Sequence, residues 1–197
     1  GMGSLIARKY TAKYGYLLDG VIYSGTSGEN PALGMGLLLA NAMIKQNGPM
    51  HRSDLLDTIA FGAYNRKTKK RTERDWSTRD EAEVDKIIAD ELCGYKYTVS
   101  GMKVLFTTLK QVTTRRWYNT IPLSMPIYLI SGTMDPVGDY SKGVNEVYKM
   151  LKYRSAVYGV LAPHRITHSL GMKLHRKNGN LYMLKSLDNA IAKSGGN

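Results

Sequence analysis

Asp135 is the acidic residue whose place in the sequence most directly suggests chemistry. The apolar run Met125–Ile130 precedes it, and the short segment 131–134 lies between the two. An apolar run of this length, bounded by turn residues, predicts a buried strand. Open α/β sheets hold their functional groups just beyond the carboxyl ends of the strands. A carboxylate at this point predicts a group that orients a catalytic base, although the sequence 135–138, Asp-Pro-Val-Gly, is also typical of a turn without chemistry.

The elements around Asp135 predict an α/β arrangement with a helical insertion. Apolar spacing predicts a helix over 4–14 that buries Leu5, Ile6 and Tyr10 and ends at Gly15. A short buried strand is expected over 21–24. Helical patterns then follow near 31–46, 53–61, 80–92 and 100–112, and an amphipathic helix is expected over 140–151. Because the helical block stands between two predicted strands, we expect it to be an insertion into one sheet domain.

Several segments resemble one branch of the α/β hydrolases. Residues 2–10 are similar to the end of the nucleophile turn Gly-His-Ser-Met-Gly-Ser, and to the helix after it, in monoglyceride lipase and lysophospholipase-like (serine aminopeptidase S33-type) enzymes. The order and spacing of further segments resemble the helical cap and a late core helix of the same enzymes: 51–57, 61–65, 71–80, 90–98 and 142–151. The resemblance implies the C-terminal half of a mostly parallel α/β-hydrolase sheet. It assigns residues 1–29 and 121–197 to the core, and residues 30–120 to an inserted cap that selects the substrate.

The resemblance also implies a chemistry, which is hydrolysis of an acyl ester or lysolipid through a serine ester. A serine attacks the carbonyl carbon, a histidine transfers the proton, and an aspartate orients the histidine. By this resemblance Asp135 is the acid, and the backbone N–H of Met2 is an oxyanion donor. The nucleophile would stand immediately before Met2, where this chain has Gly1. A lone Gly before Met is typical of a tag remnant, so we expect a truncated hydrolase that is nearly inactive.

The histidine of such a triad has two interpretations, because the resemblance stops after residue 152. In the first, residues 156–161 form the last strand and His168 is the base, with His164 as its substitute. In the second, residues 153–183 are read out of their natural frame, since shifted codons permit a Tyr-Pro-x-x-Arg-His-Glu segment. A third possibility is that these histidines belong to a solvated basic tail.

Composition limits the partners and cofactors. The net charge is +12 and the densest basic run is 66–71, but acidic residues follow at once and no nucleic-acid module surrounds it, so we expect a solvated loop and no nucleic acid partner. The single Cys93 excludes an internal disulfide and favours a cytoplasmic protein. No apolar run reaches the roughly 18 residues of an integral membrane segment. No metal-ligand cluster or phosphate loop is present in the sequence, so neither a metal nor a cofactor is expected.

A function of a different class remains open. An incomplete sheet leaves backbone groups unpaired at its edges, and such edges favour association. The alternative prediction is therefore a non-catalytic remnant that binds a partner or forms a homo-oligomer through exposed sheet edges.

Overall fold

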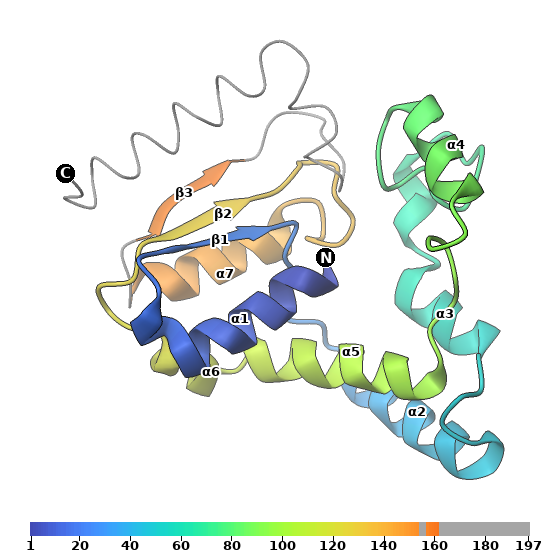
Figure 1. Ribbon diagram of the computed structural model, residues 1–197, viewed down its shortest axis with the longest axis horizontal. Helices are drawn as coiled ribbons and strands as arrows, with labels where there is room; N and C mark the ends of the chain where they lie inside the picture. The colour runs from blue at the N-terminus through green and yellow to red at the C-terminus, as the bar shows by residue number, and fades with distance from the viewer. Residues whose placement is uncertain (154–156, 162–197) are drawn as a thin grey trace. The chain divides into compact units, whose positions relative to one another are not determined.

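A computed structural model describes residues 1–153 and 157–161 (Figure 1). The chain divides into two compact units. The first comprises Gly1–Gly28 and the chain from Val112 onward, and the second is Glu29–Gln111. Each unit is described separately below.

The first unit is built on a parallel sheet. Its strands are β1 (Val21–Ser24), β2 (Ile127–Ile130) and β3 (Val157–Leu161), in the order β1-β2-β3. Val21 pairs with Ile127 and Ser24 with Ile130, while the β2–β3 register shifts once, between Ile127 and Leu129. All four residues of β2, the central strand, are buried. The predicted strands over 21–24 and in the run before Asp135 are confirmed, and so is the α/β fold class.

Three α-helices and one 3₁₀ turn complete the described part of the first unit: α1 (Met2–Tyr14), η1 (Gly15–Leu17), α6 (Arg115–Thr120) and α7 (Lys142–Lys152). Figure 1 shows α1 and α7 along the same face of the sheet. Helix α7 buries Val144, Val147 and Leu151, which recur at the spacing of an amphipathic helix.

The buried face of α1 differs from the prediction. Leu5 is buried, but Ile6 is 54% exposed and Tyr10 is 47% exposed, so the expectation that both face the core was wrong. The buried residues are instead Ser4, Leu5, Arg8 and Thr11. This set has helical spacing, and two of its four members have short hydroxyl side chains and one is charged. Hydrophobicity alone therefore placed the buried face incorrectly.

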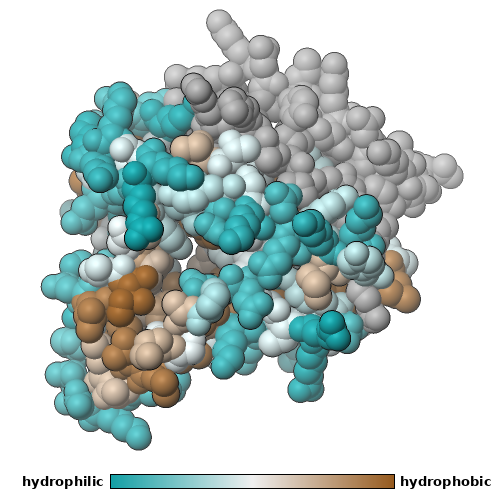
Figure 2. All heavy atoms as spheres, turned by 180° about the vertical axis from the view of Figure 1, so that it is seen from behind, coloured by the Kyte–Doolittle hydropathy of each residue, from teal (hydrophilic) through white to brown (hydrophobic). Residues whose placement is uncertain are grey.

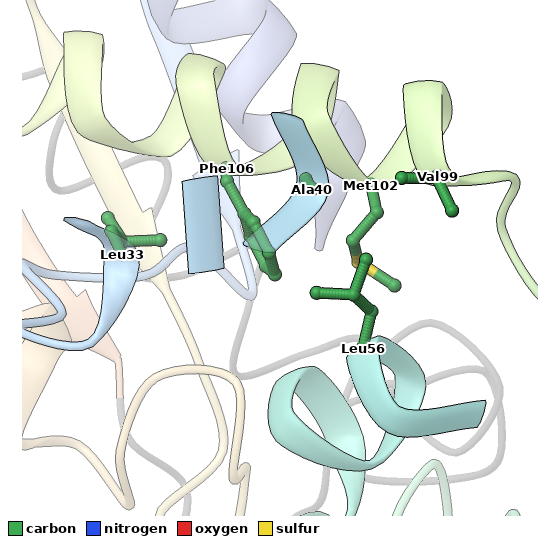
Figure 3. Packing of buried hydrophobic residues seen from close by; sticks show 6 residues of the cluster. All are labelled: Leu33, Ala40, Leu56, Val99, Met102 and Phe106. Atoms are coloured by element: carbon green, nitrogen blue, oxygen red, sulfur yellow. The ribbon is translucent and has the colours of Figure 1, made fainter. Parts of the chain in front are cut away.

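The second unit is helical. It contains α2 (Leu33–Asn47), α3 (Asp54–Phe61), η2 (Tyr64–Lys67) and α4 (Glu81–Ala89), with most of α5 (Val99–Val112). Its core is a cluster from α2, α3 and α5 (Figure 3): Leu33, Ala40, Leu56, Val99, Met102 and Phe106. Gly36 is required beside this cluster, because a Cβ there would lie 2.8 Å from Cε2 of Phe106. The predicted helices are confirmed, with ends that differ by at most three residues.

The N-termini of α3 and α4 are stabilised in different ways. The Oγ of Ser53 accepts a hydrogen bond from the Leu56 N–H at the start of α3. Asp80 occupies the N-cap of α4, but its side chain makes no capping hydrogen bond. The acidic residues Glu81 and Glu83 in the first turn instead favour this helix start through the helix dipole.

The surface of the second unit shows an apolar patch and paired charges. Figure 2 shows brown side chains gathered over part of this unit. Met35 and Leu38 of α2 are among its exposed apolar residues. Within the basic run 66–71, Lys69 pairs with Glu81 at 2.8 Å and Arg71 pairs with Asp85 at 2.7 Å. Part of the basic run is thus neutralised by α4, as its acidic surroundings suggested. Among the described residues, no helix combines the length and the apolar character needed to cross a membrane.

Candidate active site at the carboxyl edge of the sheet

Asp135 lies in a turn beyond the carboxyl end of β2. Its side chain is fully buried, and its N–H donates to the carbonyl oxygen of Gly132 at 3.2 Å. The strand is therefore followed by a tight turn that ends at Asp135. We call residues 135–138 the acid turn.

Val137 and Ser131 are donors to the carboxylate of Asp135 within the described part of the chain. The Val137 N–H donates to Oδ1 at 2.9 Å, and the Ser131 hydroxyl donates to Oδ2 at 3.4 Å. The first bond is the local one that Asp favours in turns. The second comes from the first residue after β2, a fully buried serine that the sequence analysis did not single out. Its place directly after a buried strand, four residues before Asp135, is the signal that could have identified it.

The chain beyond the acid turn adopts an uncommon backbone conformation. Three consecutive non-glycine residues, Asp139, Tyr140 and Ser141, have φ values of 48°, 52° and 79°. Such left-handed conformations persist only where the surrounding structure enforces them. Here the Tyr140 N–H donates to the Asp135 carbonyl at 2.9 Å, and the Gly143 N–H donates to the Gly138 carbonyl at 3.0 Å. The acid turn is therefore fastened to the start of α7.

The start of α1 lies at the same sheet edge. The nitrogen of Gly1 is 2.7 Å from the carbonyl oxygen of Gly25, the residue after β1, and Met2 is the first residue of α1. The Gly25 N–H in turn donates to the carbonyl oxygen of Ile130 at the end of β2. Burial lowers the pKa of the Gly1 amino group to about 6, while the Asp135 carboxylate acts in the opposite direction. The residues predicted to carry the acid and the oxyanion donor are thus brought to one edge of the sheet.

The two candidate bases lie elsewhere in the sequence. His164 and His168 are outside the described residues, as is nearly all of the segment 153–183 with its questioned reading frame. Within 1–153 and 157–161, no three His, Cys, Asp or Glu side chains gather as metal ligands would.

A buried arginine supports this edge and was not predicted. Arg8 of α1 is fully buried, and its guanidinium donates to the Ser27 carbonyl at 2.7 Å and to the Val112 carbonyl at 2.6 Å. Burial lowers the pKa of Arg8 from its ordinary value. Arg8 stands three residues after Leu5 and four after Ser4, so helical spacing alone could have placed it on the buried face.

Comparisons with known proteins agree with this geometry. The sequence model of the serine aminopeptidase S33 family matches residues 1–162. A search of curated protein sequences found no match.

Solved structures share the fold. A thermostable carboxyl esterase from Bacillus coagulans superposes with a TM-score of 0.81 at 23% identity, over 98% of this chain and 61% of that one. A monoacylglycerol lipase from Paleococcus ferrophilus gives a TM-score of 0.66 at 14% identity, over 96% of this chain and 65% of the lipase. A monoglyceride lipase variant from Saccharomyces cerevisiae gives a TM-score of 0.64 at 14% identity, over 98% of this chain and 58% of that lipase. The chain thus spans about three fifths of the length of these proteins.

The parallel sheet, the buried acid at its carboxyl edge and the match over most of the sequence lead to one assignment. The chain belongs to the serine aminopeptidase S33 family of α/β hydrolases.

Proposed function

We propose that this chain carries part of the catalytic apparatus of a serine hydrolase that cleaves carboxylic esters, of the lysophospholipase or monoacylglycerol lipase type. The single observation that carries the proposal is the buried Asp135 carboxylate, oriented by Val137 and Ser131 at the sheet edge where α1 begins. A carboxylate fixed by donors in a turn after a parallel strand suits the acid of a Ser-His-Asp triad. The names of the solved relatives, a carboxyl esterase and two monoglyceride-type lipases, support an ester as the substrate.

Each proposed residue has a defined role in this mechanism. A serine immediately before Met2 attacks the acyl carbonyl, and the Met2 N–H stabilises the resulting oxyanion. A histidine, His168 or His164, takes the serine proton and returns it to the leaving alcohol. Asp135 holds this histidine in the correct tautomer and stabilises its cation.

In the sequence given, Gly1 and not a serine precedes Met2. Loss of a triad serine costs on the order of a million-fold in turnover in a well-studied serine protease, so we propose that this polypeptide is nearly inert. An extension that restores the upstream residues and the serine would then restore ester cleavage.

Esterase assays on two proteins test the proposal. Short-chain and long-chain p-nitrophenyl esters are supplied to this chain and to a version extended upstream by its genomic flanking sequence. A fluorophosphonate probe, which labels activated serines covalently, provides a second measurement. Hydrolysis and labelling in the extended protein alone would support the proposal, whereas silence in both would contradict it.

We further propose that residues 30–120 act as a cap that sets substrate preference. The separate helical core of Glu29–Gln111 and the exposed Met35 and Leu38 on α2 support this role. In the extended protein, Leu38→Ser should change the ratio of kcat/KM between long and short esters. Asp135→Asn should lower both values equally, and an unchanged ratio in Leu38→Ser would argue against the cap role of α2.

A non-catalytic binding role is the second candidate, and β1 is the observation that favours it. Among the described strands β1 has one neighbour, β2, and its Ile22 is 51% exposed. Such an edge can accept a strand from another chain. Sedimentation velocity over a range of concentrations tests this role with Ile22→Lys as the matched variant. Association that the lysine abolishes would support the binding role, and a monomer at all concentrations would count against self-association.

A further inference from the structure

Arg8 contacts three separate segments of the first unit. One Nη1 hydrogen bond goes to the Ser27 carbonyl at 2.7 Å and a second, weaker one to the Thr26 hydroxyl at 3.3 Å, while Nη2 donates to the Val112 carbonyl at 2.6 Å. The guanidinium carbon lies 4.5 Å from the ring centre of Trp117, whose indole N–H donates to the Arg8 carbonyl at 2.8 Å. A planar fork of donors can serve several acceptors at once, which a lysine cannot.

The charge of Arg8 has no carboxylate partner among the described residues at ion-pair distance. Burying a cation is costly, and carbonyl oxygens and an aromatic face offset this cost less fully than a carboxylate does. An apolar side chain of similar size would avoid the cost. Arg8 therefore needs an explanation in terms of the groups it holds in place.

Two hydrogen bonds connect the loop that Arg8 holds to the Asp135 carboxylate. We call residues 25–28 the β1 loop, and Arg8 binds this loop at Thr26 and Ser27. From the same loop, the Ser27 hydroxyl donates to the Val137 carbonyl at 2.8 Å. The N–H of Val137 then donates to the Asp135 carboxylate at 2.9 Å. The guanidinium and the carboxylate are thus joined through one loop and one turn.

The β1 loop also contacts the start of α1, where the Gly1 nitrogen lies 2.7 Å from the Gly25 carbonyl. One loop therefore meets both the acid turn and the first residues of α1, and Arg8 fixes this loop to the middle of α1. Because α1 is a rigid helix, a fixed loop sets the distance between the helix start and the carboxylate.

We propose that Arg8 is a positioning residue that sets the β1 loop, and through Ser27 and Val137 the Asp135 carboxylate, relative to the start of α1. The proposal rests on the proposed function only for its meaning in catalysis, because the geometric link can be measured without any hydrolysis. Arg8 is fully buried and acts through the β1 loop, whose Ser27 carbonyl accepts its hydrogen bond.

The test follows the hydrogen-exchange protection of the Val137 amide by two-dimensional NMR, because this N–H donates to the Asp135 carboxylate. In Arg8→Met we expect this protection to fall about tenfold relative to the wild type. Arg8→Lys, which keeps the charge but not the fork, should give an intermediate protection.

A control separates positioning from general loss of stability. Leu151→Ala removes a fully buried side chain from α7 of the same unit and alters no residue of the β1 loop. All spectra are recorded well below the unfolding midpoint of each variant. Wild-type protection of the Val137 amide in Leu151→Ala together with reduced protection in Arg8→Met supports the proposal. Equal changes in both variants, or wild-type behaviour in Arg8→Met or Arg8→Lys, would overturn it.

A second variant keeps the test decisive if Arg8→Met does not fold. Ser27→Ala removes only the hydroxyl that joins the β1 loop to Val137. Reduced protection of the Val137 amide in Ser27→Ala supports the link, and wild-type protection contradicts it. Failure of the esterase assays would leave these NMR outcomes unaffected, so the two proposals can fail separately.

Discussion

Gly28 lies directly against Gly143, where the β1 loop meets the first turn of α7. A Cβ on Gly28 would stand 2.7 Å from both the Cα and the carbonyl oxygen of Gly143, and 2.9 Å from a carboxylate oxygen of Glu146. Neither backbone can move away easily, because both are hydrogen-bonded to the acid turn. The Ser27 hydroxyl donates to the Val137 carbonyl, and the Gly143 N–H donates to the Gly138 carbonyl. The contact excludes any side chain at position 28.

Gly28→Ala should therefore destabilise the first unit. Overpacking against backbone costs about 1–3 kcal/mol, and we expect a loss of this size in urea unfolding followed by circular dichroism. Gly3→Ala is the matched control, since a Cβ at position 3 of α1 meets no atom within 4 Å. That variant should gain about 0.5–1 kcal/mol from helix propensity. Equal stability of the two variants would contradict the close packing.

The packing of Phe106 on Gly36 makes a second prediction, in the other unit. Gly36→Ala should destabilise, because its Cβ would lie 2.8 Å from the Phe106 ring. In Phe106→Leu the ring is gone, and the same Gly36→Ala change should become neutral or stabilising. A double-mutant cycle should give a coupling of about 1 kcal/mol or more between the two positions. Additive effects would show that the ring and the glycine are not in contact.

The pH dependence of the free energy of unfolding should show that Tyr23 stays protonated in the folded state. Burial raises the pKa of this tyrosine to about 12, opposed in part by Thr11 and Arg8. The folded state therefore keeps the phenol proton at pH values where the unfolded chain, with a pKa near 10, has lost it. Stability due to this group is complete below about pH 10 and is lost as pH rises toward 12.

Comparison with Tyr23→Phe isolates this effect. The stability difference between wild type and variant should be constant below about pH 10, and then change by about 1.4 kcal/mol per pH unit, to a total near 2.7 kcal/mol. Guanidinium unfolding at several pH values measures it, with other titrating groups cancelling in the difference. A difference that stays level up to pH 12 would show that the phenol is not held protonated.

The carboxylate of Asp135 gives the prediction closest to the chemistry. In the extended protein with its serine restored, Asp135→Asn should lower kcat by about 10⁴, the size of effect known for a triad aspartate. Ser131→Ala removes a hydrogen bond of 3.4 Å, longer than the one from Val137, and should have a much smaller effect, within about tenfold. Initial rates with a short-chain p-nitrophenyl ester measure both. Full activity in Asp135→Asn would remove Asp135 from the mechanism.

The sequence predicted the elements of this fold better than their buried faces. Strands β1 and β2 followed from short apolar runs between turn residues, and α7 followed from apolar residues at helical spacing. Helix α4 ends at Ala89, earlier than expected, because Asp90 has already turned to an extended conformation with ψ of 119°. The face of α1 was placed incorrectly because it buries Arg8, and hydrophobicity patterns treat an arginine as exposed.

The sequence predicted only those parts of the candidate site that depend on residues close together in the chain. The place of Asp135 follows from one strand and one turn, so its sequence context was sufficient. Ser27 reaches Val137, and Arg8 reaches Val112, across most of the chain. Such contacts depend on how distant segments pack, and periodicity within one segment carries no information about them.

The connection between β1 and β2 has a consequence for the order of folding. These strands are neighbours in the sheet, yet the whole of Glu29–Gln111 lies between them in the chain. Closing so long a loop carries a large entropy cost, and pairings of this kind form slowly. The helical segment, which is continuous in sequence and has its own core, can collapse early and bring the two strands within reach of each other. The polypeptide should therefore acquire helical structure in the first kinetic phase, and complete its sheet, together with the setting of Asp135, in the last.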